Sequence, residues 1–147
     1  MNRFYSKSSQ YTLRALAYIA ACGQKRNFSA IEVCKKAAIP EAYTRKTFQA
    51  LVQGGFLKAI SGPGGGYTLT RKPSKITVLD IMEAVEGPEV FSGCVLGLAR
   101  CDNANPCSLH QAWVKIKKQM LKELFSKTLK DLAGNLKRSL GKKGKTK

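Results

Sequence analysis

The sequence predicts a mainly α-helical fold: a winged helix-turn-helix domain followed by a long C-terminal dimerisation helix. Three observations predict it. Apolar residues recur every three to four positions along much of this 147-residue chain. Two strand-like runs enclose a glycine-rich turn directly after two short helical segments. A later helical segment is apolar on two sides, and its own domain can cover only one of them.

The charge of the chain indicates an anionic polymer as partner. Lys and Arg number 26 against 9 Asp and Glu, which gives a formal charge of +17 and favours nucleic acid. Five cysteines, no signal-peptide pattern and no apolar run as long as a membrane span predict a cytoplasmic protein without a membrane segment. In that reducing compartment, clustered cysteines bind metals or sense redox state more often than they form structural disulfides.

The first helix is predicted over residues 8 to 22, with Ser8 or Ser9 as its cap. Its inward face holds four apolar residues at helical spacing: Leu13, Leu16, Ala17 and Ala20. Cys22 ends this helix and Cys34 lies in the next one. Neither has a second ligand nearby in the sequence, so we expect both to be core residues.

A helix-turn-helix is predicted over the next two helices. Ser29 caps a short helix with Glu32 at the capping-box position, and a second helix runs over residues 41 to 53. Six apolar residues of this pair are predicted to face the core: Ile31, Val33, Ala37, Phe48, Leu51 and Val52. Four residues of the second helix project outward, where they can read the DNA major groove: Tyr43, Arg45, Lys46 and Gln49. A merely solvated basic face is the alternative.

A hairpin over residues 56 to 70 completes the winged domain. Strands are predicted at Phe56 to Ile60 and at Tyr67 to Thr70, with Ser-Gly-Pro-Gly-Gly-Gly between them. The last three of these glycines are Gly64, Gly65 and Gly66, and their backbone can approach DNA closely. Arg71 follows the wing. Thr77-x-x-Asp80 then opens a helix that ends at Gly87-Pro88, so the domain covers residues 1 to 88.

Residues 89 to 106 form a loop that carries the candidate metal centre. Four ligand residues follow one another as C-x6-C-x5-C-x2-H: Cys94, Cys101, Cys107 and His110. Asn105 as cap and Pro106 as first helical residue would start a helix there and put Cys107 and His110 on one face of it. Spacing alone also fits a structural zinc, a thiol-disulfide switch or unrelated cysteines, although the C-x2-C knuckle typical of zinc fingers is absent.

Residues 107 to 136 are predicted to be dimerisation helices. A helix from Pro106 to about Phe125 carries two apolar stripes: Leu109, Trp113, Ile116, Met120 and Leu124, and Val114, Leu121 and Phe125. Thr128-x-x-Asp131 caps a last helix whose apolar face is Leu129, Leu132, Leu136 and Leu140. Residues 137 to 147 contain six basic residues and no acidic one, which predicts a disordered basic tail available to DNA.

Several motifs occur together in one order and spacing. They are Tyr11-x-Leu-Arg-Ala-Leu, Ile39-Pro40-x-x-Tyr43, Gly62-Pro-Gly-Gly-Gly-Tyr67, the segment from Ile76 to Gly87, the three loop cysteines, Cys107-x-Leu-His110-x-x-Trp113 and Thr128-Leu-x-Asp-Leu-Ala133. In this order the chain resembles the Rrf2 family of bacterial transcription regulators over about residues 6 to 133. The family includes sensors of iron-sulfur clusters, nitric oxide, iron and cysteine metabolism.

The resemblance implies a homodimer that binds a double-stranded DNA operator and holds one Fe-S cluster per subunit on Cys94, Cys101 and Cys107. In the iron-sulfur cluster sensors, the histidine of Cys-x-x-His is the fourth ligand of a 2Fe-2S cluster, which corresponds to His110; a 4Fe-4S cluster is the alternative. In the nitric-oxide sensors an acidic residue before the first-helix tyrosine takes that position from the partner subunit. Gln10 stands there in this chain and is a poor ligand.

The recognition helix departs from the family pattern. Thr44 and Thr47 stand where the family usually has apolar residues, and Arg45 stands where one branch has an acidic specificity residue. The operator sequence therefore does not follow from the resemblance.

The predicted function is a DNA-binding transcription regulator whose DNA affinity or specificity is controlled by an Fe-S cluster that senses iron-sulfur, redox or nitric-oxide status. A metal-free cysteine thiol switch on the same scaffold is the alternative. An enzyme with Cys107 as nucleophile and His110 as base is disfavoured, because no separate carboxylate is placed to orient the base. A non-specific nucleic-acid packing protein would fit the charge but does not need the cysteine loop.

Overall fold

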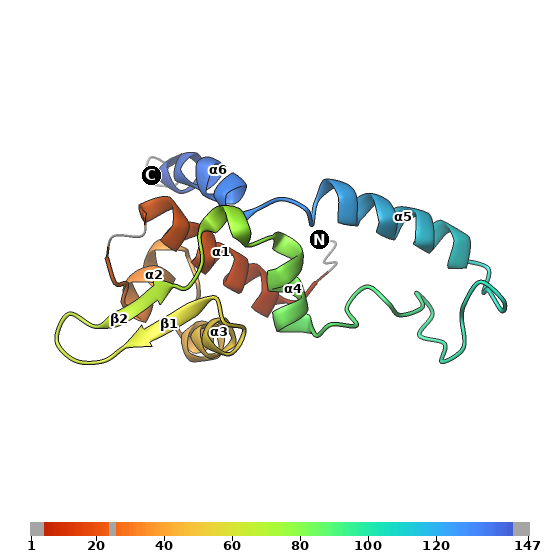
Figure 1. The fold of residues 1–147 in the computed structure, drawn as a ribbon, viewed down its shortest axis with the longest axis horizontal. Helices are drawn as coiled ribbons and strands as arrows, with labels where there is room; N and C mark the ends of the chain where they lie inside the picture. Colours follow the sequence, from red (N-terminus) through yellow and green to blue (C-terminus); the bar gives the residue numbers. More distant parts are fainter. Residues whose placement is uncertain (1–4, 24–25, 143–147) are drawn as a thin grey trace.

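The computed structural model describes residues 5–23 and 26–142, and it confirms a mainly helical fold with a two-stranded wing (Figure 1). The elements follow in the order α1 (Lys7–Cys22), α2 (Ala30–Lys36), α3 (Glu41–Gln53), β1 (Leu57–Ile60), β2 (Gly66–Leu69), a 3-10 turn (Pro73–Lys75), α4 (Val78–Glu86), α5 (His110–Glu123) and α6 (Leu129–Lys142). Among the residues described, no helix combines the length and the apolar character that crossing a membrane would require.

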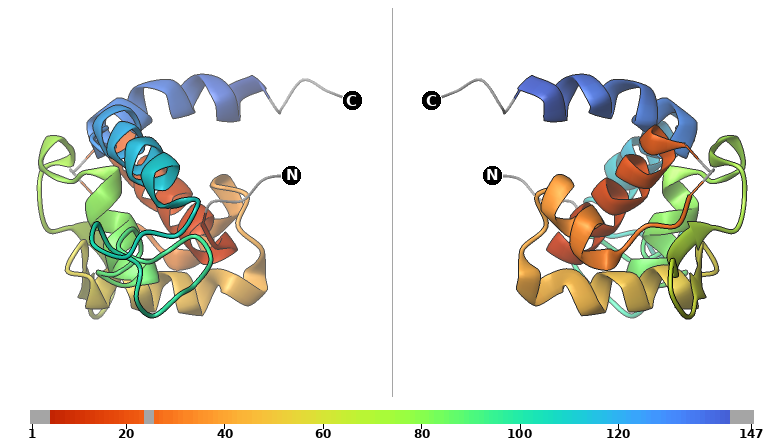
Figure 2. Two further views of the ribbon diagram at one scale, coloured as in Figure 1. Left: turned by 90° about the vertical axis from the view of Figure 1, so that its right-hand side faces the viewer. Right: turned by 90° about the vertical axis from the view of Figure 1, so that its left-hand side faces the viewer.

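Helix α1 is the centre of the core. It lies between α6 and α3 (Figure 2, right) and also contacts α2 and α4. Its Ala15, Leu16 and Ile19 are almost fully buried. Other elements surround them with large apolar side chains: Phe28, Leu51, Phe56, Leu57, Ile76, Ile81 and Leu129. Each Leu, Ile or Phe side chain buried in this way stabilises the fold by about 1.5–3 kcal/mol.

The predicted caps of α2, α4 and α6 are confirmed. The Ser29 hydroxyl accepts a hydrogen bond from the Glu32 amide at 3.1 Å, although the Glu32 carboxylate pairs with Arg26 at 2.6 Å instead of closing the capping box. The capping box at the start of α4 is complete, with both reciprocal bonds between Thr77 and Asp80 at 2.9 and 3.1 Å. Thr128 and Asp131 make the same pair of bonds before α6, at 2.8 and 3.3 Å.

Helix α1 begins earlier than predicted. Ser6 caps it, accepting a hydrogen bond from the Ser9 amide at 3.2 Å. Ser9 cannot be the cap because it lies inside the helix, is buried, and donates its hydroxyl to Glu86 at 2.6 Å. The prediction of Ser8 or Ser9 as the cap was therefore wrong, and the cap lies closer to the N-terminus, at Ser6.

Three side chains predicted to be in the core lie at the surface. Ile31 is 78% exposed, Val52 is 38% exposed, and Cys22 at the end of α1 is exposed as well. Helix α2 is seven residues long and its inward side is filled by Val33 and Cys34, so Ile31 points away. Cys34 is buried, as predicted.

The wing is an antiparallel hairpin with Ile60 opposite Gly66 at its tip. Strand β1 ends at Ile60 as predicted but begins one residue later, at Leu57, and β2 lies one residue earlier than predicted, at Gly66–Leu69. Phe28 exchanges two backbone hydrogen bonds of 2.8 Å with Tyr67. The segment before α2 therefore supports one edge of the wing.

The chain leaves the body of the fold after α4. Gly87 ends α4 with a φ of 100°, as predicted, and the loop that follows runs to α5 beyond the body (Figure 1). Helix α5 starts at His110 rather than Pro106, and it ends at Glu123. Asn105 does not cap it: Leu109 stands at the N-cap position of α5, and the Asn105 amide closes an earlier turn by donating to Asp102 at 2.8 Å.

Helix α6 extends further than expected. It runs to Lys142, so residues 137–142 are helical and the prediction of disorder from 137 onward was wrong for them. Residues 143–147, and the side chain of Leu140, lie outside what the structure describes. Leu129 is buried against the α1 core, and Leu132 and Leu136 are partly buried there.

Candidate metal centre and nucleic-acid interface

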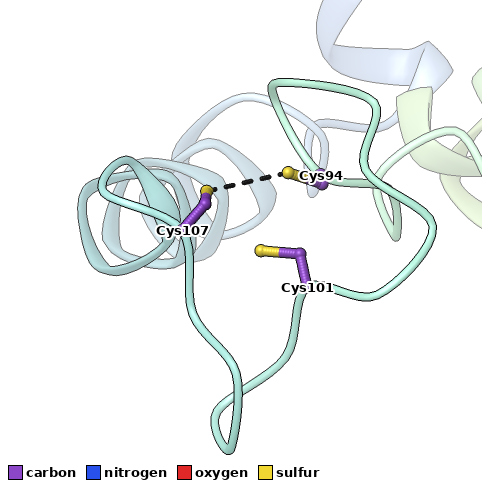
Figure 3. A group of neighbouring side chains, drawn as sticks. All are labelled: Cys94, Cys101 and Cys107. Carbon is purple, nitrogen blue, oxygen red and sulfur yellow. Dashed lines mark hydrogen bonds between the residues drawn. The ribbon is translucent and has the colours of Figure 1, made fainter.

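The loop after α4 brings three thiols together. The sulfur atoms of Cys94, Cys101 and Cys107 all lie within 4.8 Å of one another, and those of Cys94 and Cys107 are 3.7 Å apart. Figure 3 shows the three side chains pointing toward one another from separate parts of the loop. All three are partly exposed. Residues spread over fourteen positions of irregular chain thus form one cluster of soft ligands.

His110 lies beside this cluster. Its Nδ1 is 3.3 Å from the Cys101 sulfur. Cys107 lies before α5 rather than inside it, so the predicted placement of Cys107 and His110 on one helical face was wrong. A turn keeps them close instead, since the His110 amide donates to the Cys107 carbonyl at 3.1 Å.

The thiols differ in acidity. Backbone amides of Leu98 and Leu96 donate hydrogen bonds to the Cys94 sulfur, which lowers the pKa of its thiol. Desolvation acts in the opposite direction, and the resulting pKa is about 7. The backbone amide of Cys107 acts in the same direction on Cys101. Burial and the two neighbouring thiols outweigh that bond, so the pKa of Cys101 is raised. Near neutral pH, Cys94 is therefore the thiol that is ready to bind a metal or to react.

The four side chains form two pairs, and in each pair the two ligand atoms are separated by about the distance expected for two ligands of one metal ion. Two sulfurs bonded to one tetrahedral ion at about 2.3 Å lie about 3.8 Å apart, and a sulfur and a nitrogen lie about 3.6 Å apart. The Cys94–Cys107 distance is 3.7 Å and the Cys101–His110 distance is 3.3 Å. The donor set therefore fits a metal centre, either as two pairs on two ions or as four ligands on one.

Three supporting contacts were not anticipated from the sequence. The Trp113 indole donates to the Gly93 carbonyl at 3.0 Å and anchors the loop next to Cys94. Asn103 contacts the second nitrogen of His110 at 3.1 Å. Asp102 closes the turn that carries Asn103. An Asp-Asn pair in a loop signals such a turn, whereas the role of Trp113 was hidden by its place in an apolar stripe.

Helix α3 presents the expected polar face, with one correction. Arg45, Lys46 and Gln49 are exposed on it. Tyr43 is only half-exposed, and its ring packs on Tyr11 with centroids 4.8 Å apart, so Tyr43 belongs partly to the core. An aromatic ring at the first turn of α3 thus serves the packing of α1 on α3.

The wing glycines are required by the fold itself. Gly64 has a φ of 73° and is exposed at the turn. A Cβ on Gly65 would lie 2.2 Å from the Ile60 carbonyl oxygen, and one on Gly66 would lie 2.6 Å from that of Phe28. Asn27 donates its side-chain amide to the Gly64 carbonyl at 2.9 Å and holds the turn in place. The glycines therefore allow close backbone contacts within the wing, in addition to any contact with DNA.

Arg71 lies at the base of the wing. Its guanidinium is 5.2 Å from the centre of the Phe56 ring, and the residue is exposed. It is thus packed on the body but accessible on the side of the wing.

One apolar side of the α5 region stays uncovered. Phe125, just after α5, is buried, and Met120 and Leu121 pack partly on the same small cluster as Val78. Leu109, Ile116 and Leu124 are 42%, 52% and 50% exposed. None of the α5 residues, all of which the structure describes, is buried.

The comparisons with known proteins agree with this architecture. The model of the Rrf2 family, described as an iron-dependent transcriptional regulator, matches residues 5–135. The chain belongs to the Rrf2 family. It is 32% identical over 130 residues to a proposed HTH-type transcriptional regulator of Aquifex aeolicus, covering 87% of this chain and 90% of that one. It is 25% identical to the HTH-type transcriptional regulator IscR of Xenorhabdus nematophila, with 88% and 79% covered.

Two solved structures of regulators share the fold. CymR, the global cysteine regulator of B. subtilis, has a TM-score of 0.74 at 28% identity and covers 91% of this chain and 98% of its own. The IscR of T. potens has a TM-score of 0.71 at 25% identity and covers 91% and 88%. This Rrf2 protein is therefore a DNA-binding transcription regulator and not an enzyme.

Proposed function

We propose that this Rrf2 protein is a homodimeric regulator that binds a double-stranded DNA operator under the control of an Fe-S cluster. Cys94, Cys101, Cys107 and His110 would hold the cluster, and the cluster would supply a group whose presence or oxidation state changes with iron-sulfur, redox or nitric-oxide status. The observation that carries the proposal is the convergence of three thiols within 4.8 Å beside an imidazole nitrogen. A 2Fe-2S cluster is favoured over 4Fe-4S because the histidine of Cys-x-x-His, here His110, is a ligand of such a cluster in the iron-sulfur cluster sensors that the chain resembles.

A route for coupling the loop to DNA starts at the last residue of α4. The Glu86 carboxylate accepts hydrogen bonds from the Ser6 amide at 2.8 Å and the Ser9 hydroxyl at 2.6 Å, both at the start of α1. Glu86 also lines a groove of about 630 Å³ together with Lys46 and Gln49 of the recognition helix. A rearrangement of the loop after Glu86 would thus reach α1 directly, and α3 through its packing on α1.

Anaerobic purification tests the cluster. The intact protein should be coloured and contain iron and sulfide, whereas Cys94→Ala, Cys101→Ala and Cys107→Ala should each lose the visible absorbance. Cys34→Ala and Cys22→Ala are the matched controls and should keep it, because Cys34 is buried in the body and Cys22 lies at the end of α1. Stoichiometric zinc without iron would refute the proposal.

The homodimer would use the uncovered apolar side around α5. A charge at Ile116 should produce monomers, because this 52% exposed apolar side chain would be covered by the second subunit. Ile31→Glu, at a more exposed apolar residue on the DNA-binding domain, is the control and should stay dimeric. Light scattering after size exclusion distinguishes the two. A monomeric unmodified chain at micromolar concentration would contradict the dimer.

A metal-free thiol switch is the second candidate, and one observation favours it. The Cys94 and Cys107 sulfurs are 3.7 Å apart, and the Cys94 pKa of about 7 supplies a thiolate. A mild oxidant would then take two electrons and two protons from the pair and form one disulfide. If iron-free protein gains or loses operator binding with formation of the 94–107 disulfide, and reducing agent reverses it, this candidate replaces the cluster.

A further inference from the structure

Both ring nitrogens of His110 have a defined neighbour. Nδ1 is 3.3 Å from the Cys101 sulfur, and Nε2 is 3.1 Å from the side-chain oxygen of Asn103. An amide oxygen only accepts hydrogen bonds, so Nε2 must carry the hydrogen in this contact. The lone pair of Nδ1 is then directed at the thiol cluster.

The Asn103 side chain is held in place by the turn that contains it. The Asp102 carboxylate accepts hydrogen bonds from the amides of Ala104 at 2.9 Å and Asn105 at 2.8 Å. These two bonds fold the chain back between Cys101 and Cys107. The turn thereby delivers the amide of Asn103 to the far side of the imidazole.

We propose that Asn103 is a positioning residue that fixes the tautomer of His110, so that His110 binds the cluster through Nδ1. This inference rests on the proposed function. A histidine ligand needs its second N–H engaged, because that bond sets which nitrogen binds and which way the ring faces. Asn103 supplies the acceptor from within the cysteine loop, so ligands and support come from the same short segment.

The tautomer can be measured without any metal. His110 is the only histidine of the chain, so nitrogen-15 labelling of histidine reports on this ring alone. In spectra of the metal-free protein recorded at a pH of about 8.5, the hydrogen should be found on Nε2 only. Asn103→Asp keeps the acceptor and should keep the single tautomer. Asn103→Leu removes the acceptor at a similar size and should give a mixture of the two.

Asn105→Leu is the matched control. Asn105 is an exposed asparagine of the same turn, and its bond to Asp102 uses the backbone amide, which the substitution retains. Its spectrum should equal that of the unmodified protein. A hydrogen on Nδ1 in the unmodified protein, or an unmixed tautomer in Asn103→Leu, would overturn the inference.

The loaded protein gives an independent test. With histidine labelled at Nδ1 alone, pulsed electron paramagnetic resonance of the reduced cluster should show coupling to that nucleus. Removal of iron by a chelator should be about 10-fold faster in Asn103→Leu, with Asn103→Asp and Asn105→Leu close to the unmodified rate. Coupling to Nε2 instead, or equal rates in all variants, would overturn the inference. A cluster that forms on the three cysteines with no nitrogen coupling would do so as well, and would remove His110 from the ligand set while leaving control of DNA binding by the cluster intact.

Discussion

The body of the protein and its cysteine region are stabilised in different ways. Large apolar side chains from four other helices and the hairpin surround α1 in the body, and several of them are completely buried. From Glu83 to Leu124, all of which the structure describes, no residue is buried. Hydrogen bonds, thiol contacts and a few partly buried apolar side chains, among them Phe91 and Met120, order that region instead.

This difference shows how one small chain can be both stable and responsive. An apolar core of many contacts changes little when one surface ligand binds or leaves. A loop held by a few partly exposed polar contacts opens at low cost. The cysteine loop can therefore change its conformation with its ligand while the DNA-binding body stays folded.

The largest expected effect is a difference in how much a leucine in each region contributes to the free energy of unfolding. Leu16→Ala removes a completely buried side chain from α1 and should lower the free energy of unfolding by about 2–5 kcal/mol. Leu96→Ala removes a leucine that is 55% exposed in the cysteine loop, and should change it by less than about 0.5 kcal/mol. Urea unfolding followed by circular dichroism measures both. Equal losses in the free energy of unfolding would show that the side chains of the loop contribute to the apolar core of the body.

A second prediction concerns the reading of DNA by the body. Arg45 is exposed on α3, so Arg45→Ala should cost about 1–3 kcal/mol of base discrimination at one position per half-site. Truncation after Lys142 is the comparison, since it removes three lysines without removing helix α6. It should weaken binding to all sequences alike and reduce the slope of the salt dependence by about 0.9 for each DNA phosphate that those lysines neutralise. Opposite patterns for the two variants would exclude α3 as the reading helix.

A smaller effect is expected at the wing. Asn27→Ala removes the 2.9 Å bond to the Gly64 carbonyl and should weaken DNA binding by about 0.5–1 kcal/mol without altering sequence preference. Ser61→Ala, at an exposed residue of the same turn, is the control. Titrations of operator and scrambled DNA measure both quantities. A change in base preference in Asn27→Ala would mean that the wing reads sequence.

The smallest structural effect, and the clearest chemical one, is expected in the loop. In the metal-free protein, alkylation of Cys94 should reach half its maximal rate near pH 7, because its pKa is about 7, whereas Cys101 with its raised pKa should react only at higher pH. Since the folded pKa of Cys94 lies below its ordinary value, the associated stabilisation is complete above pH 9 and is lost as the pH falls through 7. Mass spectrometry of iodoacetamide-treated protein against pH checks this, and equal profiles for both cysteines would contradict it.

Local rules were sufficient where a segment is decided by its own residues. Helix α3 has the bounds that the sequence predicts, because Pro40 and Gly54 flank it. The Thr77–Asp80 capping box and the stop at Gly87 also follow from residue type alone. The grouping of Cys94, Cys101 and Cys107 was predicted from spacing, since short loops keep such ligands near one another.

The sequence by itself thus determined the winged helix-turn-helix, the exposed basic face of α3 and the identity of the candidate ligands, because periodicity, caps and turn residues act over a few positions. The tertiary structure decided what depends on distant partners. Glu86 of α4 binds Ser6 and Ser9 at the start of α1, and the chain just after Asp102 forms a turn, with α5 beginning only at His110. Ile31 and Cys22 are exposed because none of the elements in the described residues covers them, which no local pattern could predict.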